Sequence, residues 1–162
     1  MEYTKTLKRK TALIFNENAL QESRTTLNKY LVDFLNLSLI TKQAHWNIQG
    51  KNFISVHTML DQFYDTLLNH IDIFAERIVQ LNYSAVGTAE HLAQNTSFEE
   101  YPDNISSVED HLQELHIRYS YVANSLREDI RLGKADEATI DYYTSAVEDL
   151  DKFVWFIEAQ LN

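Results

Sequence analysis

A chain of 162 residues with 44% apolar and 12% aromatic side chains is long enough to bury the core of one domain and too apolar for a disordered protein. Its net charge of −10 argues against a nucleic-acid-binding body, because phosphates would be repelled, and the absence of cysteine excludes disulfides and thiolate metal sites. With only 3 glycines and 1 proline, the chain favours a few long helices over many short strands.

The N-terminal segment differs in charge from the rest of the chain. Its first ten residues hold one acidic side chain, Glu2, and four basic ones, so the remainder carries about −13; the basic residues are Lys5, Lys8, Arg9 and Lys10. The segment lacks the apolar run of a signal peptide, and no stretch of the chain is apolar for long enough to span a membrane. We therefore expect residues 1–15 to be a flexible basic tail and residues 16–162 to be a single domain of a cytoplasmic protein.

The first two helices are predicted over about 18–45 and 53–81. Leucines and aromatic residues recur at helical spacing through both ranges. The turn residues Asn47 and Gly50 separate the two helices. So short a connection predicts an antiparallel pair of neighbours.

A polar connection of about 25 residues follows and contains the only proline, Pro102. Its middle, TAEHLAQN, is expected to form one short helix, because loops of this length usually carry structure of their own or a function.

The last two long helices have clear end signals. The third is expected to start at Ser106, in a capping-box spacing with Glu109, and to end at Gly133. The fourth is expected to start at the N-cap residue Asp136 and to run to about residue 160. Two short connections flanking one long crossover predict an all-α fold, a ferritin-like four-helix bundle with a short extra helix between helices two and three.

The second helix has two distinct stripes. On a wheel of ~100° per residue, an apolar stripe faces the bundle, and a second stripe of potential metal ligands lies ~120° away. The apolar stripe consists of Val56, Leu60, Phe63, Tyr64, Leu67, Ile71, Phe74, Ile78 and Leu81, and the other of His57, Asp61, Asp65, Asp72 and Glu76. Because Leu68 and Val79 also lie on the second stripe, we expect it to meet another surface.

Two pairs on this stripe have the i, i+4 spacing that lets two side chains reach one ion: His57 with Asp61, and Asp72 with Glu76. The pairs cannot share an ion within one chain, because their centres lie ~22 Å apart along the helix. An antiparallel copy of the helix, related by a two-fold axis near Thr66, would place each pair against the other and create two identical sites.

A third histidine supports the same arrangement. His45 ends the first helix, so the short turn can bring it beside His57. One subunit would then supply His45, His57 and Asp61, and its partner would supply Asp72 and Glu76. Imidazole with carboxylate suits iron, manganese or zinc rather than calcium. Carboxylates on a long helix are nevertheless often merely solvated, and spacing alone leaves that alternative open.

The stretch QAHWNIQGKNFISVHTMLDQFYD, followed by DIFAER, resembles the Dps family of mini-ferritins. The ferroxidase motif of that family has a His before Trp, a His twelve residues on, an Asp four later, and D-x-x-x-E eleven later. All five positions match, as His45, His57, Asp61, Asp72 and Glu76. DLDKFVWFIEAQL resembles the final helix of the family, so the likeness extends from about residue 15 to the end.

The resemblance implies a catalytic iron site between subunits, where the same five residues bind Fe(II). Glu76 would be the main ligand from the partner subunit and Asp72 a weaker one. Hydrogen peroxide, or dioxygen, would oxidise the iron, and a hollow dodecamer would store the Fe(III) as a mineral that protects DNA and the cell from oxidative damage. Zinc or another divalent metal would be able to occupy the same site.

DNA binding stays open, because some Dps proteins use Lys-rich tails for it and others do not bind DNA. The alternative is therefore a nucleoid-associated structural protein that shields DNA physically.

The remaining candidates carry weaker signals. We interpret His70, His91, His111 and His116 as surface or packing residues, because none belongs to a Glu-x-x-His motif. Trp46 is expected mainly to pack, with trapping of oxidising equivalents as the alternative, and Trp155 is expected in the core. Asp65 would lie at the two-fold interface. Acidic residues at the start of the fourth helix either line a pore for cations or serve as cap and solvated surface; they are Asp136, Glu137 and Asp141.

Overall fold

The computed structural model describes residue 13 and residues 16–162, so the proposed basic tail lies almost wholly outside the described residues. This part of the chain forms five helices and no strand: α1 (Glu17–Asn47), α2 (Phe53–Gln80), α3 (Ala89–Asn95), α4 (Val108–Arg131) and α5 (Glu137–Leu161). The all-α prediction is confirmed.

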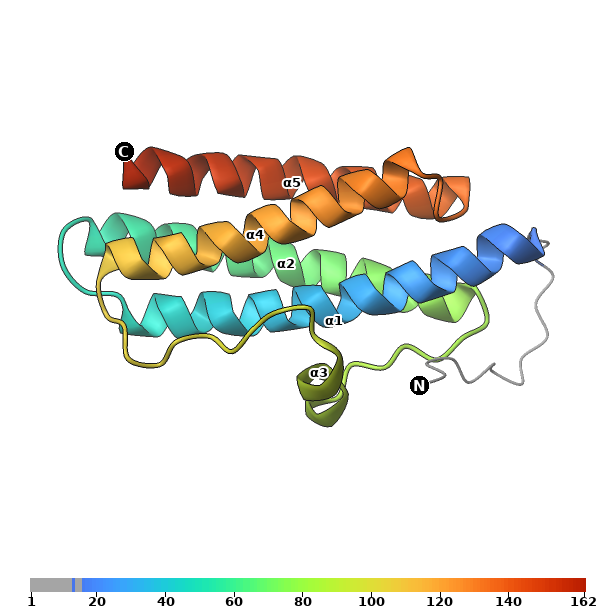
Figure 1. Ribbon diagram of the computed structural model, residues 1–162, viewed down its shortest axis with the longest axis horizontal. Helices are drawn as coiled ribbons and strands as arrows, with labels where there is room; N and C mark the ends of the chain where they lie inside the picture. The colour runs from blue at the N-terminus through green and yellow to red at the C-terminus, as the bar shows by residue number, and fades with distance from the viewer. Residues whose placement is uncertain (1–12, 14–15) are drawn as a thin grey trace.

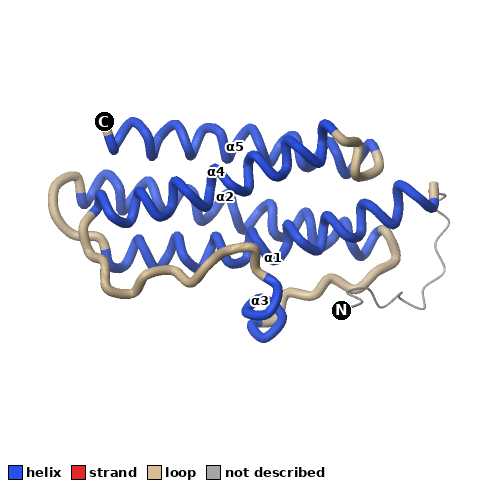
Figure 2. Tube along the Cα trace, viewed as in Figure 1, coloured by secondary structure: helices blue, strands red, loops and turns tan. Residues whose placement is uncertain are grey.

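The four long helices lie side by side as a bundle, and α3 lies outside it against α1 (Figure 1). Helices α1 and α2 form one antiparallel hairpin, and α4 and α5 form the other. The crossover that contains α3 runs back along the bundle, so that α2 and α4 point the same way (Figure 2). This is the connectivity predicted from one long and two short connections.

Helix ends follow their capping residues. Asn16 accepts hydrogen bonds from two backbone amides of the first turn of α1, which therefore starts one residue before the predicted position. The prediction of Ser106 as the N-cap of the third long helix is wrong by one residue, because Oγ of Ser107 accepts the amide hydrogen of Asp110 at 3.0 Å. Gly133 ends α4 with a φ of 63°, a conformation that glycine adopts without strain.

Three tyrosines fill the centre of the bundle, and their hydroxyls are all hydrogen-bonded. The hydroxyl of Tyr30 donates to Asp129 at 2.6 Å, and those of Tyr119 and Tyr143 share hydrogen bonds with threonines of α1 at 2.8 and 2.6 Å. All three are fully buried. Because each hydroxyl has a partner, these large side chains contribute apolar area without the cost of an unpaired buried polar group.

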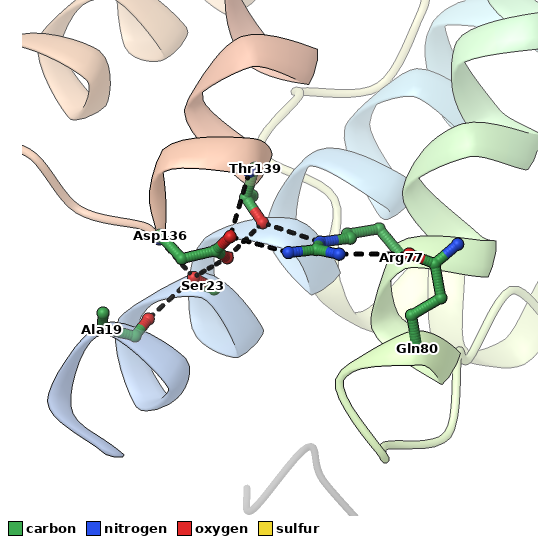
Figure 3. A network of polar contacts seen from close by, with 6 residues as sticks. All are labelled: Ala19, Ser23, Arg77, Gln80, Asp136 and Thr139. Atoms are coloured by element: carbon green, nitrogen blue, oxygen red, sulfur yellow. Dashed lines mark hydrogen bonds and ion pairs between the residues drawn. The ribbon is translucent and has the colours of Figure 1, made fainter. Parts of the chain in front are cut away.

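A buried polar network ties three helices together at the end of the bundle where α2 finishes (Figure 3). Arg77 of α2 donates from Nη2 to Asp136 at 2.6 Å and from Nε to Thr139 at 3.1 Å. Asp136 accepts the amide hydrogen of Thr139 as the N-cap of α5, and Ser23 of α1 lies 2.9 Å from its other oxygen. The network fixes the last turn of α2, which directly follows Glu76.

The crossover is held against the bundle at two places. Near α3, the buried carboxylate of Asp33 accepts hydrogen bonds from the amide and the hydroxyl of Ser97, each at 2.9 Å. At the other end, Gln49 in the α1–α2 turn pairs through its backbone with the residues that precede α4. The long connection therefore holds the metal-ligand end of the α1–α2 hairpin in place.

Trp155 is not in the core, in contrast to the prediction, because 62% of it is exposed. Phe153 and Ile157 on either side of it are buried, and two residues along a helix correspond to ~200° of rotation, which turns Trp155 outward. Trp46 is also 66% exposed, so most of it is not covered by its own subunit. Among the described helices, none is both long and apolar enough to cross a membrane.

Candidate metal centre

His45 and His57 lie face to face across the α1–α2 hairpin. Their ring centroids are 3.5 Å apart, and the two planes are inclined by 21°. Nδ1 of each ring lies 2.9 Å from the backbone carbonyl oxygen of the other histidine. The tight turn between the helices, with Gly50 and Asn52 both at positive φ, produces this reciprocal arrangement.

The reciprocal hydrogen bonds place a hydrogen on Nδ1 of both rings. A carbonyl oxygen can only accept, so each Nδ1 must carry the hydrogen. In the neutral imidazole, the lone pair is then on Nε2, the nitrogen that remains available for a metal. The backbone of the hairpin therefore holds the two rings in fixed orientations and leaves Nε2 of each for a metal.

Asp61 completes a group of three on the hairpin. One possible ligand atom from each of His45, His57 and Asp61 lies within 4.8 Å of the others. Oδ1 of Asp61 lies 3.3 Å from Nδ1 of His45, and about half of its side chain is exposed. Two imidazoles and a carboxylate suit iron or zinc, and three protein ligands leave coordination positions open.

Lys42 forms a contact in this group that the sequence did not predict. Its ammonium lies 2.6 Å from Oδ1 of Asp61 and 5.2 Å from the ring centroid of Tyr64. The hydrogen bond from Lys42, together with the positive charge that His45 would carry when protonated, lowers the pKa of Asp61 below its ordinary value. The only sequence signal was the position of Lys42, one turn before His45 on the same helix.

Asp72 and Glu76 do not join this group within one chain. Both are exposed on α2, and they lie 11 and 15 residues beyond Asp61, or ~16 and ~22 Å along the helix. Asp65 and Leu68 are exposed on the same helix between the two groups. The described chain therefore carries three of the five expected ligands at one end of the α1–α2 hairpin and the other two, well separated, towards the opposite end of α2.

The other histidines have structural partners, in agreement with their interpretation as packing or surface residues. Buried His70 lies 2.8 Å from Asp149, and buried His111 accepts from or donates to the hydroxyl of Tyr101 at 2.7 Å. Within the described part of the chain, only the His45 group brings three potential ligands together.

The acidic residues at the start of α5 differ in whether they have partners among the described residues. Asp136 is the N-cap and the ion-pair partner of Arg77, so the expectation of a capping role is confirmed. Glu137 and Asp141 are exposed and remain available to cations.

Comparisons with known proteins agree with this fold. Residues 24–162 match the model of a ferritin-like domain. A protein of Agrobacterium fabrum named "DNA protection during starvation protein" is 44% identical over 140 residues, which cover 84% of this chain and 85% of that protein.

Solved structures of Dps proteins have the same architecture. The tetragonal form of Mycobacterium smegmatis Dps superimposes with a TM-score of 0.89 at 29% identity, covering 96% of this chain and 95% of that one. The Vibrio cholerae protein, described as a member of the ferritin-like diiron-carboxylate superfamily, gives 0.83 at 26% identity, covering 94% and 100%.

Proposed function

Because the chain belongs to the Dps family of ferritin-like proteins, we propose that it is a ferroxidase of the mini-ferritin type. It oxidises Fe(II) with hydrogen peroxide, or with dioxygen, and stores Fe(III) as a mineral inside a hollow dodecamer. Removal of iron and peroxide protects DNA and the cell. Iron is the substrate and the stored cargo, and zinc competes for the same ligands.

The observation that carries this proposal is the paired orientation of His45 and His57. Each Nδ1 is held by the carbonyl of the other residue, and Asp61 lies one turn further along α2. A histidine that served only for packing would not need to lie face to face with a second histidine beside a carboxylate. The hairpin supplies three ligands with little reorganisation on binding.

The remaining ligands come from a second copy of the chain in this proposal. A two-fold axis near Thr66 brings Asp72 and Glu76 of the partner to the His45 group, with two sites ~22 Å apart. Exposed apolar side chains on the hairpin favour such contact, since Leu39 and Leu68 are 57% and 41% exposed in one chain. The partner's carboxylates would also balance the charge of the bound iron.

The proposed site consumes peroxide without the hydroxyl radicals that form when Fe(II) and peroxide react free in solution. Peroxide needs two electrons to become water, and each Fe(II) supplies one. When both electrons reach peroxide at a protein site, no hydroxyl radical is released into solution. The neutral imidazoles bind Fe(II) without adding charge, and the carboxylates favour the Fe(III) product, which leaves for the cavity.

A double variant tests the proposal. Protein carrying His57→Ala and Asp61→Ala is mixed anaerobically with Fe(II) and peroxide, and ferric absorbance and particle size are followed. The control carries His116→Ala and Glu158→Ala, another histidine–carboxylate pair, whose atoms lie 2.9 Å apart between α4 and α5. We expect fast oxidation to disappear in the first variant only, and equal rates in all proteins would reject the assignment.

The alternative, a mainly structural role on DNA, is favoured by the basic residues among the first ten. The variant with His57→Ala and Asp61→Ala also distinguishes the two roles. If the protein acts mainly by shielding DNA, loss of His57 and Asp61 leaves its protection of DNA against peroxide and iron intact. If it acts as a ferroxidase, that protection is lost even where DNA is still bound.

A further inference from the structure

The candidate metal centre contains a positive charge of its own. Oδ1 of Asp61 is already bonded to the ammonium of Lys42 at 2.6 Å, so Oδ2 is the carboxylate oxygen left for a metal. A first iron can bind at Oδ2, but a second iron at Asp61 would need Oδ1 and would have to displace the ammonium, which repels it at that distance. The side chains of this hairpin therefore favour one iron at a time.

A site that holds one Fe(II) can give peroxide only one of its two electrons. One-electron reduction of peroxide yields hydroxide and a hydroxyl radical. A second electron must therefore come from a group close to the iron if the radical is not to escape. This requirement rests on the proposed ferroxidase function.

Tyr64 is placed to supply that electron. It lies three residues after Asp61 on α2, is half-buried, and has its ring centroid 5.2 Å from Nζ of Lys42. Since that nitrogen is 2.6 Å from Oδ1 of Asp61, the phenol ring lies within about 8 Å of the carboxylate. Electron transfer through a protein is fast over so short a distance.

We propose that Tyr64 is a redox-active residue, the donor of the second electron to peroxide at a one-iron site. Fe(II) and the phenol each give one electron. Peroxide takes both, together with the phenolic proton and one proton supplied by the buffer, and two water molecules form. The products are Fe(III) and the neutral phenoxyl radical of Tyr64. A second Fe(II) and one proton then restore the phenol, so two Fe(II) are consumed per peroxide.

Other oxidisable side chains are placed less well for this step. The core tyrosines Tyr30, Tyr119 and Tyr143 are fully buried, and their hydroxyls are hydrogen-bonded to Asp129 and to threonines of α1. Trp46 adjoins His45 in sequence but is 66% exposed, and an indole radical there would be open to solvent in a single subunit. Tyr64 is shielded and its ring faces Lys42, the residue bonded to Asp61.

Freeze-quench electron paramagnetic resonance tests the proposal on the assembled protein. Anaerobic protein receives one Fe(II) per chain and then peroxide, with and without a hydroxyl-radical spin trap. The variant is Tyr64→Phe, which keeps the aromatic ring. The matched control is Tyr121→Phe, since Tyr121 of α4 also faces a lysine, Lys29, at 5.7 Å, but Lys29 lies ~20 Å from Lys42 along α1.

The wild-type protein and the control should show a tyrosyl signal that disappears when more Fe(II) is added. Tyr64→Phe should lose the signal and give more spin adduct. A wild type that forms ferric iron without a tyrosyl signal, or a signal that persists in Tyr64→Phe, overturns the role of Tyr64 and leaves the ferroxidase function standing. If peroxide produces no ferric iron in the wild type, both proposals are wrong.

Mass spectrometry of the wild type gives a measurement that needs no variant. After repeated additions of Fe(II) and peroxide, oxidative modification should accumulate at Tyr64 before Tyr121. Equal modification of both residues would contradict the proposal.

Discussion

Replacement of Lys42 by methionine should strengthen metal binding at the His45 group. The ammonium of Lys42 occupies one oxygen of Asp61 at 2.6 Å, so an incoming cation must compete with it. Lys42→Met removes the competing charge and keeps most of the apolar stem, which limits the effect on packing.

The size of the effect follows from the exposure of the pair. The Asp61 side chain is 48% exposed and that of Lys42 is 22% exposed, so water screens much of their attraction. Pairs of this kind contribute about 0.2–1 kcal/mol, which corresponds to metal binding that is tighter by up to about fivefold.

Anaerobic titration calorimetry with Zn(II) measures this difference, because zinc binds similar ligands and is not oxidised. Lys29→Met is the control, since Lys29 is on the same helix but faces the ring of Tyr30 rather than an acidic ligand. Zinc affinity in Lys29→Met should match the wild type. If Lys42→Met binds zinc equally well or more weakly, Lys42 does not compete with the metal and instead holds Asp61 in position.

Three further predictions concern stability and partners. Arg77→Met leaves the largely buried Asp136 without its ion-pair partner and should lower the free energy of unfolding by about 3–5 kcal/mol, measured by urea denaturation at fixed protein concentration. The control Arg131→Met removes an exposed ion pair and should barely move the urea midpoint. Burial alone would raise the pKa of Asp136, but hydrogen bonds from Thr139 and Ser23 and the charge of Arg77 lower it below 3.8. The stability that this carboxylate contributes is therefore present above about pH 4 and is lost as the pH falls further. Asp136→Asn should remove this loss, so the free energy of unfolding of the variant should fall less steeply in acid than that of the wild type. Removal of residues 1–10 should abolish any DNA gel shift seen at low salt, and the shift of the full chain should weaken steeply as salt rises; binding that survives the deletion would exclude the basic tail as the DNA contact.

Much of the fold was predictable because its signals are local. Asp136 as an N-cap, Gly133 as a helix end and the short helix after Thr88 are each decided by a few neighbouring residues. The error of one residue at Ser106 arose because two serines in succession offer the same cap, and the backbone contact with Gln49 selects Ser107. The prediction for Trp155 was wrong because an apolar stretch does not by itself show which way each side chain turns on the helix, and Trp155 turns away from the buried Phe153 and Ile157.

The candidate metal centre was likewise only partly predictable from the sequence. The i, i+4 spacing of His57 and Asp61 was visible in the sequence, and a short turn was enough to bring His45 close. The reciprocal hydrogen bonds of the two histidines and the contacts of Lys42 were not predictable, because they depend on the register between α1 and α2.

The sequence by itself therefore determined the four long helices, their order and the residues that carry metal-ligand chemistry, since periodicity and capping act over a few residues. Tertiary structure alone decided the donor nitrogen of each imidazole, the lysine that shares the carboxylate of Asp61 and the tyrosine beside it. These features arise where side chains from two helices meet, and a shift of either helix by one residue would rotate its side chains by ~100° and separate them.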